Sequence, residues 1–291
     1  MNNIKGTTRV CGLIGNPVGH SISPVIHNTL ADIMGIDLVY TTFKVDAGEV
    51  ATAVKGAYAL DICGLNVTVP HKQAVMDSLI DIDPLAEAIG AANTLQRCNG
   101  GYKGYNTDIL GLARELDDEG VQIAGNPVVI LGAGGAARAI AFLCASKKAA
   151  SVKILNRTVE KAQNIADAVN EYYKSDIASA DSIEKAADIG IDGYVVIQTT
   201  SVGLYPDVDA VSVTSPEFYD KASVGVDIIY NPYTTKFMKL MREHGKLAYN
   251  GLKMLLYQGV AAFEIWNNCV VSKDIADKVY ISMKEALGIN E

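Results

Sequence analysis

The sequence predicts an α/β protein made of two α/β domains, and three observations carry this prediction. Strand-like and helix-like segments alternate along most of the chain, as in sheets of parallel strands joined by helices. The glycine-rich segment VVILGAGGAARA (128–139) lies between a predicted strand and a predicted helix. The chain has 291 residues, 49% of them hydrophobic, which is enough for two cores of ordinary size.

The first domain is predicted from apolar periodicity and from the residues that interrupt it. RVCGLIG (9–15) alternates as a strand does, and a helix should begin at Ser23 as its N-cap, with Pro24 in the first helical position and Gly35 at its end. The expected elements that follow are strand 38–45, a helix near 47–58, strand 65–69, a helix beginning near Lys72, and strand 92–96.

The second domain should open after a helix at 107–119, where EGVQIAGNP forms a polar break. Its predicted strands are 127–131, 151–155, 194–199 and 223–229, with helices starting near Gly135 and Thr158. This is the pattern of a Rossmann-type doubly wound dinucleotide-binding fold. The tail, 252–287, reads as two helices that we expect to return to the first domain, so the domains should span 1–106 with 252–291, and 107–251.

Composition excludes several classes of protein. The net charge of −8 argues against nucleic-acid binding, and the five cysteines and four histidines show no metal-ligand spacing. The start lacks a secretory pattern, and the most apolar window, 128–145, is broken by Arg138 and by glycines. We therefore expect a cytoplasmic protein without a structural metal, with neither nucleic acid nor membrane as a partner.

The glycine-rich loop predicts a nucleotide site. Gly132, Gly134 and Ala137 form G-x-G-x-x-A, in which glycines permit a tight turn and the helix N-terminus carries a pyrophosphate. The next strand ends in Asn156, Arg157 and Thr158, with Lys161 one turn later, where NAD-binding chains usually have an acid. A guanidinium pairs with a 2′-phosphate, so NADP is favoured over NAD. A loop without ligand, and a solvated Arg157, are the alternatives.

Polar residues on the first domain form a second candidate site. In NVTVPHK (66–72), Asn66 and Thr68 share one face of a predicted strand, Pro70 ends it, and Lys72 follows. Ser21 and Ser23 precede a helix start, where hydroxyls and backbone donors suit a carboxylate, although a plain helix cap would explain Ser23 alone. Asn93 and Asp108 are turn formers or caps taken singly, but buried asparagine and threonine need partners.

These segments together resemble the shikimate dehydrogenase family over essentially the whole chain. The motifs that carry the resemblance are HSISPVIHN, GLNVTVPHK, GAANTL, GYNTD, GAGGAARA, NRT, TSVGLYP, DIIYNPYTTKF and NGLKMLLYQGVAAFEIW. The resemblance implies a reversible, NADP-linked oxidation of the ring alcohol of shikimate to 3-dehydroshikimate. That step leads towards chorismate and the aromatic amino acids.

The resemblance also implies roles for individual residues. Lys72 matches the catalytic lysine and Asp108 its partner at the reacting hydroxyl, while Ser21 and Ser23 match the serines that hold the substrate carboxylate. The further substrate contacts it implies are Asn66, Thr68, Asn93, Tyr230 and Gln258. The cofactor residues it implies are the phosphate loop Gly132, Ala133, Gly134, Gly135 and Ala136, the 2′-phosphate clamp Asn156, Arg157, Thr158 and Lys161, and Ile228 and Gly251 near the nicotinamide.

Two rival functions stay open at this point. One is a quinate/shikimate dehydrogenase that tolerates NAD, and the pair Ser21 and Ser23, in place of a serine and a threonine, favours shikimate over it. The other is a nucleotide-binding regulator without turnover, which has no chemical reason to keep both Lys72 and Asp108. The chain departs from the family pattern at Gln198, often asparagine, and at Lys253, often glycine. Lys253 could alter cofactor preference, His71 receives no role, and the protonation state of Lys72 and a homodimer are left open.

Overall fold

The computed structural model describes residues 4–289 and contains two units with separate cores. Among the described residues, one unit comprises residues 4–111 and 255–289, and the other residues 112–254. The divisions fall inside α4 (Thr107–Asp118) and inside α9 (Leu252–Asn267), a few residues from the expected boundaries. Apart from the first turn of α9, the two C-terminal helices belong to the first unit, as expected.

The first unit is built on a six-stranded mixed sheet in the order β2-β1-β3-β5-β6-β4. Its strands are β1 (Arg9–Gly15), β2 (Leu38–Lys44), β3 (Gly64–Val67), β4 (Asp81–Ile82), β5 (Thr94–Cys98) and β6 (Gly101–Tyr105). The expectation of a parallel arrangement is wrong for β5, which runs antiparallel to both neighbours. The reason is local, because β5 and β6 form a hairpin whose loop is Asn99–Gly100, with Gly100 at a φ of 92°.

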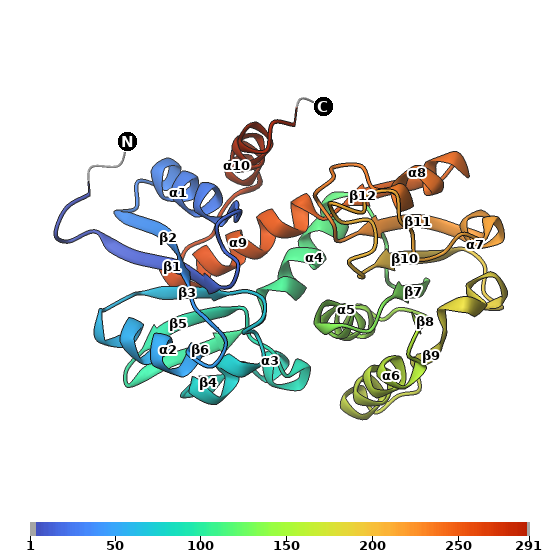
Figure 1. The fold of residues 1–291 in the computed structure, drawn as a ribbon, viewed down its shortest axis with the longest axis horizontal. Coiled ribbons are helices and arrows are strands. Elements are labelled where there is room, and N and C mark those ends of the chain that lie inside the picture. Colours follow the sequence, from blue (N-terminus) through green and yellow to red (C-terminus); the bar gives the residue numbers. More distant parts are fainter. Residues whose placement is uncertain (1–3, 290–291) are drawn as a thin grey trace. The chain divides into compact units, whose positions relative to one another are not determined.

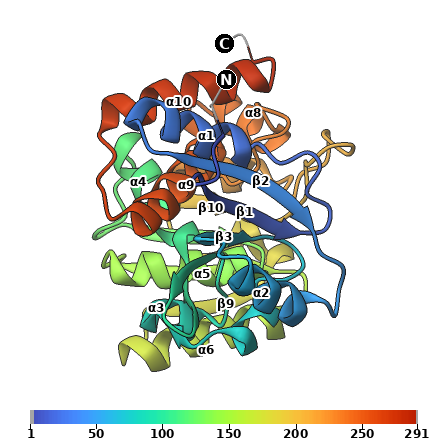
Figure 2. The ribbon, with the colours of Figure 1, turned by 90° about the vertical axis from the view of Figure 1, so that its left-hand side faces the viewer.

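Helices cover both faces of this sheet. The helices are α1 (Ser23–Met34), α2 (Val50–Ala59), α3 (Pro84–Ile89), the short 3₁₀ helix η1 (Ala74–Ser78), α9 and α10 (Lys273–Ala286). Helices α1 and α10 lie side by side on one face, and α2 lies on the other (Figure 2). On the α2 side, Val50 and Val54 pack against Leu65 and Leu95 of the sheet.

Three local expectations for this unit are wrong. Ser23 is not the N-cap of α1, since Ile22 holds that position without a side-chain cap and the Ser23 hydroxyl bonds elsewhere. Lys72 does not begin a helix; it lies in a turn that precedes η1. Strand β3 ends at Val67, so Thr68 lies just beyond it instead of sharing a strand face with Asn66.

The second unit has a six-stranded sheet in the order β12-β11-β10-β7-β8-β9, with every pairing parallel. Its strands are β7 (Pro127–Leu131), β8 (Ser151–Asn156), β9 (Ala178–Ser182), β10 (Tyr194–Gln198), β11 (Ala222–Asp227) and β12 (Leu247–Asn250). The chain begins at β7 in the middle of the sheet and continues through β8 to β9 at one edge. It then returns to the middle with β10 and continues through β11 to β12 at the other edge. That order is the doubly wound arrangement, so the predicted Rossmann-type fold is confirmed.

Helices also lie on both faces of the second sheet (Figure 1). They are α5 (Gly135–Ser146), α6 (Val159–Tyr173), the 3₁₀ helix η2 (Ile183–Asp188), α7 (Pro216–Lys221) and α8 (Lys236–Glu243). Phe218 of α7 and Phe237 of α8 pack in one core with Val129 and Val196 of the sheet. Within residues 4–289, no helix is long and apolar enough to cross a membrane.

Candidate functional site

Lys72 and Asp108 form an ion pair in the first unit. The Lys72 Nζ donates to Asp108 Oδ2 over 2.6 Å, and the two side chains are 33% and 17% exposed. Asp108 lies in the first turn of α4, and the Lys72 carbonyl accepts a hydrogen bond from the Ala92 N–H at 2.9 Å. The Lys72 side chain is therefore held in place at the Asp108 carboxylate and stays within reach of a small molecule.

Asn93 holds the other oxygen of the Asp108 carboxylate. Its Nδ2 donates to Asp108 Oδ1 over 2.8 Å, while its Oδ1 accepts from the Thr107 N–H at 2.7 Å. Asn93 is 2% exposed, so these bonds are shielded from water. With one donor on each oxygen, the carboxylate plane is fixed, and with it the position of the Lys72 amine.

Asn66 is the centre of a buried hydrogen-bond network. Its Oδ1 accepts from the Tyr40 hydroxyl at 2.8 Å and faces His27 Nε2 at 3.1 Å. Its Nδ2 donates to the Asn93 carbonyl at 3.2 Å and to Thr94 Oγ1 at 3.0 Å. Because an amide has two acceptor positions and two donor hydrogens, the Asn66 side chain is fully satisfied.

The two serines are hydrogen-bonded to each other. Ser21 Oγ donates to Ser23 Oγ over 3.1 Å, and the Ser23 N–H donates back to Ser21 Oγ over 3.2 Å. Burial raises the pKa of the Tyr40 phenol well above its usual range. Hydrogen bonds run without a break from Tyr40 through Asn66 and Asn93 to Asp108 and Lys72.

Sequence reasoning missed four members of this network: His27, Tyr40, Thr94 and Thr107. Thr94 and Thr107 follow Asn93 and precede Asp108 directly, and their hydroxyls lie 2.9 Å apart. Both are fully buried, which is unusual for threonine without partners. Thr94 and Thr107 lie inside the motifs GAANTL and GYNTD, and this position was the sequence signal for including them in the site.

Three more predicted substrate contacts lie outside this network. Thr68 is half-buried, and its N–H donates to the Ile14 carbonyl over 2.9 Å. Gln258 lies on α9 of the first unit and its Nε2 donates to the Leu255 carbonyl over 2.8 Å. Tyr230 belongs to the second unit, just after β11, where burial raises the pKa of its phenol.

The second unit contains a cavity of about 540 Å³ at the ends of β7 and β8. Seven predicted cofactor residues line it: Gly132, Ala133, Gly134, Asn156, Arg157, Thr158 and Lys161. Gly135 and Ala136 begin α5 beside it. Seven further lining residues escaped the sequence reasoning: Ile183, Thr199, Thr200, Ser201, Val202, Val211 and Ser212. Only the fold brings these segments to the loop, because β10 is the direct neighbour of β7.

The cavity suits a dinucleotide with a phosphate on its ribose. Gly132 has a φ of 110°, and a Cβ there would lie 2.7 Å from Thr199 Oγ1, so only glycine fits. A Cβ on Gly134 or Gly135 would meet nothing within 4 Å, which leaves the N-terminus of α5 open to a pyrophosphate. Arg157 and Lys161 are exposed, and neither forms an ion pair with any residue in 4–289. These residues fit NADP.

Ile228 and Gly251 lie against each other in the second unit. A Cβ on Gly251 would stand 2.1 Å from the Ile228 carbonyl oxygen, so no other residue can occupy that position without a backbone shift. The loop after β11 is anchored by Asp227, which accepts from the Ile229 N–H at 3.0 Å and from Thr235 Oγ1 at 2.7 Å. Burial raises the pKa of the Asp227 carboxyl to about 7.

The two departures from the family pattern both have structural partners. Gln198 is buried, and its side chain bonds the Thr200 N–H at 3.0 Å and the Val202 carbonyl at 3.1 Å, so it shapes the turn that lines the cavity. The Lys253 amine pairs with Asp118 at 2.6 Å and Glu119 at 2.5 Å. An effect of Lys253 on cofactor preference stays a prediction.

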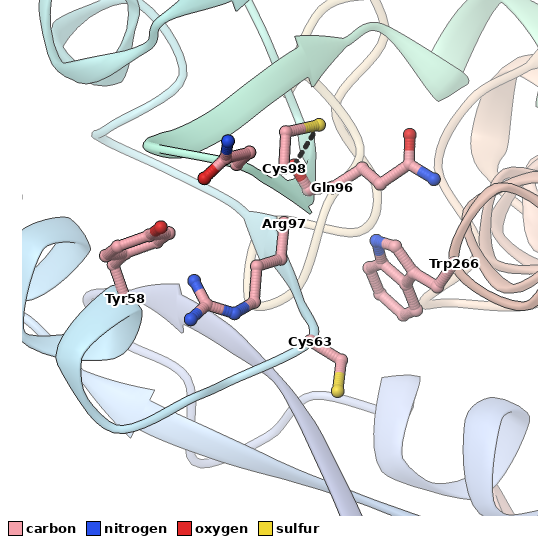
Figure 3. A pocket seen from close by; sticks show the side chains of 7 residues that line it. Tyr58, Cys63, Gln96, Arg97, Cys98 and Trp266 are labelled. Atoms are coloured by element: carbon pink, nitrogen blue, oxygen red, sulfur yellow. Dashed lines mark hydrogen bonds between the residues drawn. The ribbon is translucent and has the colours of Figure 1, made fainter.

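A separate cavity of about 470 Å³ in the first unit is drawn in Figure 3. Its walls are Tyr58, Cys63, Gln96, Arg97, Cys98, Asn99 and Trp266, none of which belongs to the predicted site. The Arg97 guanidinium points to the Tyr58 ring, 3.8 Å from its centroid, and its Nε donates to Asp61 over 2.8 Å. The Arg97 guanidinium already has Asp61 and the Tyr58 ring as partners, so we assign this cavity no role.

Comparisons with known proteins agree along most of the chain. Family models match residues 13–95 (shikimate dehydrogenase substrate binding domain), 113–201 (shikimate/quinate 5-dehydrogenase) and 251–278 (shikimate 5′-dehydrogenase C-terminal domain). A shikimate dehydrogenase (NADP(+)) of Caldanaerobacter subterraneus subsp. tengcongensis is 43% identical over 273 residues, which cover 93% of this chain and 96% of that protein.

Solved structures give the same result. A shikimate dehydrogenase in complex with NADP+ superposes with a TM-score of 0.88 at 37% identity, covering 96% of each chain. The shikimate 5-dehydrogenase of Listeria monocytogenes, in complex with shikimate and NAD, superposes with a TM-score of 0.88 at 31% identity, covering 96% of this chain and 98% of that one.

Proposed function

The chain belongs to the shikimate dehydrogenase family, and from that premise we propose that it catalyses the reversible, NADP-linked oxidation of shikimate to 3-dehydroshikimate. The reaction is a step of chorismate and aromatic amino acid biosynthesis. The observation that carries the proposal is the Lys72–Asp108 pair, held by Asn93, because an alcohol dehydrogenase needs a proton acceptor at a fixed position. A nucleotide-binding regulator would gain nothing from such a pair.

Lys72 and Asp108 act on the proton of the reacting hydroxyl. As hydride leaves the carbinol carbon, the oxygen must lose its proton or carry negative charge. The Lys72 side chain, held at 2.6 Å from Asp108 Oδ2, can accept this proton when its amine is neutral, and the ammonium so formed stays paired with the Asp108 carboxylate. Asn93 keeps the carboxylate from rotating away, so the pair meets the hydroxyl in one geometry.

The remaining substrate contacts are proposed by matching the hydrogen-bonding groups of the residues to those of shikimate. Ser21 and Ser23 offer hydroxyls to the carboxylate. Asn66 has no spare hydrogen-bonding position, so a ring hydroxyl reaches its Nδ2 by replacing the 3.2 Å bond to the Asn93 carbonyl, the longest of the four bonds. Thr68, Tyr230 and Gln258 complete the set of proposed contacts.

NADP supplies the hydride acceptor when bound, and this chain's own residues select it over NAD. Arg157 and Lys161 are exposed cations at the end of β8, where a 2′-phosphate lies in a doubly wound fold. Thr158 and Asn156 add polar groups to the same wall. Ile228 and Gly251 form the proposed nicotinamide region.

One kinetic comparison tests the proposal. Purified protein is assayed with shikimate or quinate, each with NADP or NAD, by the absorbance of the reduced nicotinamide. We expect the highest kcat/KM for shikimate with NADP. Higher kcat/KM for quinate, or for NAD, would favour the quinate/shikimate dehydrogenase instead, and absence of turnover with all four pairs would favour the regulator.

Two further properties follow from the same proposal. All five cysteines are unpaired thiols, which suits a reducing compartment, and we propose the cytoplasm. The sequence leaves a homodimer open, and light scattering by the purified protein decides between one copy and two.

A further inference from the structure

His27 is a buried histidine with no role in the proposed reaction. It lies on α1 within HSISPVIHN, is 0% exposed, and so cannot touch substrate. Its ring stacks on Tyr40, with centroids 4.1 Å apart at 16°, and lies 5.1 Å from the ring of Trp266. Aromatic packing alone would accept a phenylalanine here, so the polar atoms of the ring must be explained separately.

The neighbours of Asn66 fix the hydrogen on His27. The Asn93 carbonyl can only accept, so the Asn66 Nδ2 must face it and Oδ1 must face His27. Since Oδ1 carries no hydrogen, His27 Nε2 is the donor. Burial lowers the pKa of His27 to about 3, so the ring is neutral and holds its single hydrogen on Nε2.

This donor and the Tyr40 hydroxyl occupy both acceptor positions of Asn66 Oδ1. Turning the amide over would place an oxygen against the Asn93 carbonyl and a hydrogen against each of the two donors. The orientation of Asn66 is therefore determined, and with it the Nδ2 bond to Thr94 Oγ1 at 3.0 Å. The Thr94 hydroxyl lies 3.2 Å from Asn93 Oδ1, so the order extends to the residue that holds Asp108.

We propose that His27 is a positioning residue for the dehydrogenase reaction: its Nε2–H fixes the amide of Asn66, and through it the hydroxyl-binding face of the substrate site. The inference rests on the proposed function, since Asn66 is a substrate contact only there. Tyr40 shares the task through the second acceptor position of the Asn66 oxygen. Without His27, the Asn66 oxygen keeps one of its two donors, and the amide is held less firmly in the orientation that binds substrate.

The test is a double-mutant cycle between His27→Phe and Asn66→Ala. Phenylalanine keeps the ring stacking and removes the donor, so we expect kcat/KM for shikimate to fall about 3- to 10-fold, mostly through KM, as for one lost hydrogen bond. The KM for NADP should not change. In the Asn66→Ala background the same substitution should change kcat/KM by less than about 2-fold, because the group it acts through is gone. Equal losses in both backgrounds would overturn the proposal.

Two variants separate positioning from folding. His27→Gln restores an N–H donor near the Nε2 position and should recover kcat/KM to within about 2-fold of wild type. His244→Phe is the matched control, because His244 lies on the second unit, outside every proposed site, and pairs with Asp220. Trp266 is the single tryptophan and packs on His27, so unchanged emission shows that each variant keeps this packing. Failure of His27→Gln to recover any activity in a folded protein would also contradict the proposal.

A spectroscopic readout keeps this inference apart from the proposed function. Long-range ¹H–¹⁵N spectra of the ¹⁵N-histidine-labelled protein, with His27→Phe for assignment, report which ring nitrogen carries hydrogen. We expect the Nε2–H form of His27 at neutral pH, whether or not the protein turns over shikimate. A hydrogen on Nδ1 would overturn the inference, and absent turnover with the Nε2–H form would instead fail the proposed function.

Discussion

The substrate side of the first unit and the nucleotide cavity of the second unit hold polar groups in opposite ways. In the first unit Lys72, Asp108, Asn93 and Asn66 are bonded to one another, with buried amides and one ion pair. In the second unit Arg157 and Lys161 are exposed and, within residues 4–289, form no ion pair. The substrate side is therefore held in place by its own hydrogen bonds, without substrate. The positive charges of the nucleotide cavity are instead available to pair with a phosphate.

Because of this difference, removing a side chain from one region should change a different kinetic constant than removing one from the other. Lys72, at the reacting hydroxyl, acts on the charge that develops during the reaction, so its removal should lower kcat. An exposed cation supplies attraction to a distant phosphate, so its removal should raise KM for one cofactor. The predictions below test that division.

The largest effect is expected at Lys72, the member of the bonded network proposed to act on the reacting hydroxyl. Lys72→Ala should lower kcat by ~10² or more while shikimate binding stays largely intact, because the amine acts on the charge that develops during the reaction. Steady-state rates and a titration with shikimate measure the two quantities. Lys55→Ala, an exposed lysine on α2, is the control. Unchanged turnover in Lys72→Ala would remove the lysine from the mechanism.

The exposed clamp should give a smaller and more selective effect. Arg157→Ala should raise KM for NADP about 10- to 100-fold, the loss expected for a charge-assisted bond to a phosphate. NAD lacks the 2′-phosphate, so its KM serves as the internal control and should stay within about 2-fold. Equal changes for both cofactors would show that Arg157 does not read the phosphate.

Burial of His27 should make the first unit sensitive to acid. The folded pKa, about 3, lies below the unfolded value near 6.5, so the unfolded chain binds the proton first as pH falls. The contribution of neutral His27 to the free energy of unfolding is therefore complete above about pH 6.5 and is lost as the pH falls towards 3. Between pH 7 and pH 5 the free energy of unfolding should fall by about 2 kcal/mol. Urea unfolding of wild type and His27→Phe at both pH values measures it, and the variant should lose less. The same loss in both proteins would show that His27 is not the cause.

The last prediction concerns the stability of the second unit and a backbone contact of Gly251. In Gly251→Ala the new methyl would lie 2.1 Å from the Ile228 carbonyl oxygen, so the backbone must move. We expect about 1–3 kcal/mol of lost stability, as for overpacking, and weaker binding of both cofactors. Gly56→Ala on α2 is the control, because a Cβ there meets nothing within 4 Å. Equal melting temperatures for the two variants would contradict the contact.

The sequence predicted the second unit better than the first. Gly132 and Arg157 were found because a parallel sheet sends each strand end to one edge, and the loop chemistry follows the strand in sequence. The direction of β5 was missed because an alternating pattern reports burial and does not report orientation. The hairpin at Asn99–Gly100 carried that information, but it lay outside the segments assigned as strands.

The sequence led to the residues proposed for the candidate site but not to the residues that hydrogen-bond them. Lys72, Asn66, Asn93 and Asp108 stand in recognisable motifs, whereas Tyr40 on a strand has the pattern of a core residue. Tyr40 is indeed core, at 2% exposure, and only the structure shows that its hydroxyl meets Asn66. Ser23 was expected to be a helix cap because of its place before Pro24, but its hydroxyl accepts from Ser21 and caps no backbone N–H of α1.

Salt dependence of the two Michaelis constants tests the contrast between the regions most directly. Exposed charges are screened by ions, whereas buried hydrogen bonds are screened much less. Between about 0.02 M and about 0.5 M sodium chloride, the KM for NADP should rise several-fold, and the KM for shikimate should stay within about 2-fold. An equal rise in both constants, or a rise for shikimate alone, would contradict the contrast between a hydrogen-bonded substrate site and a cofactor clamp of exposed charges.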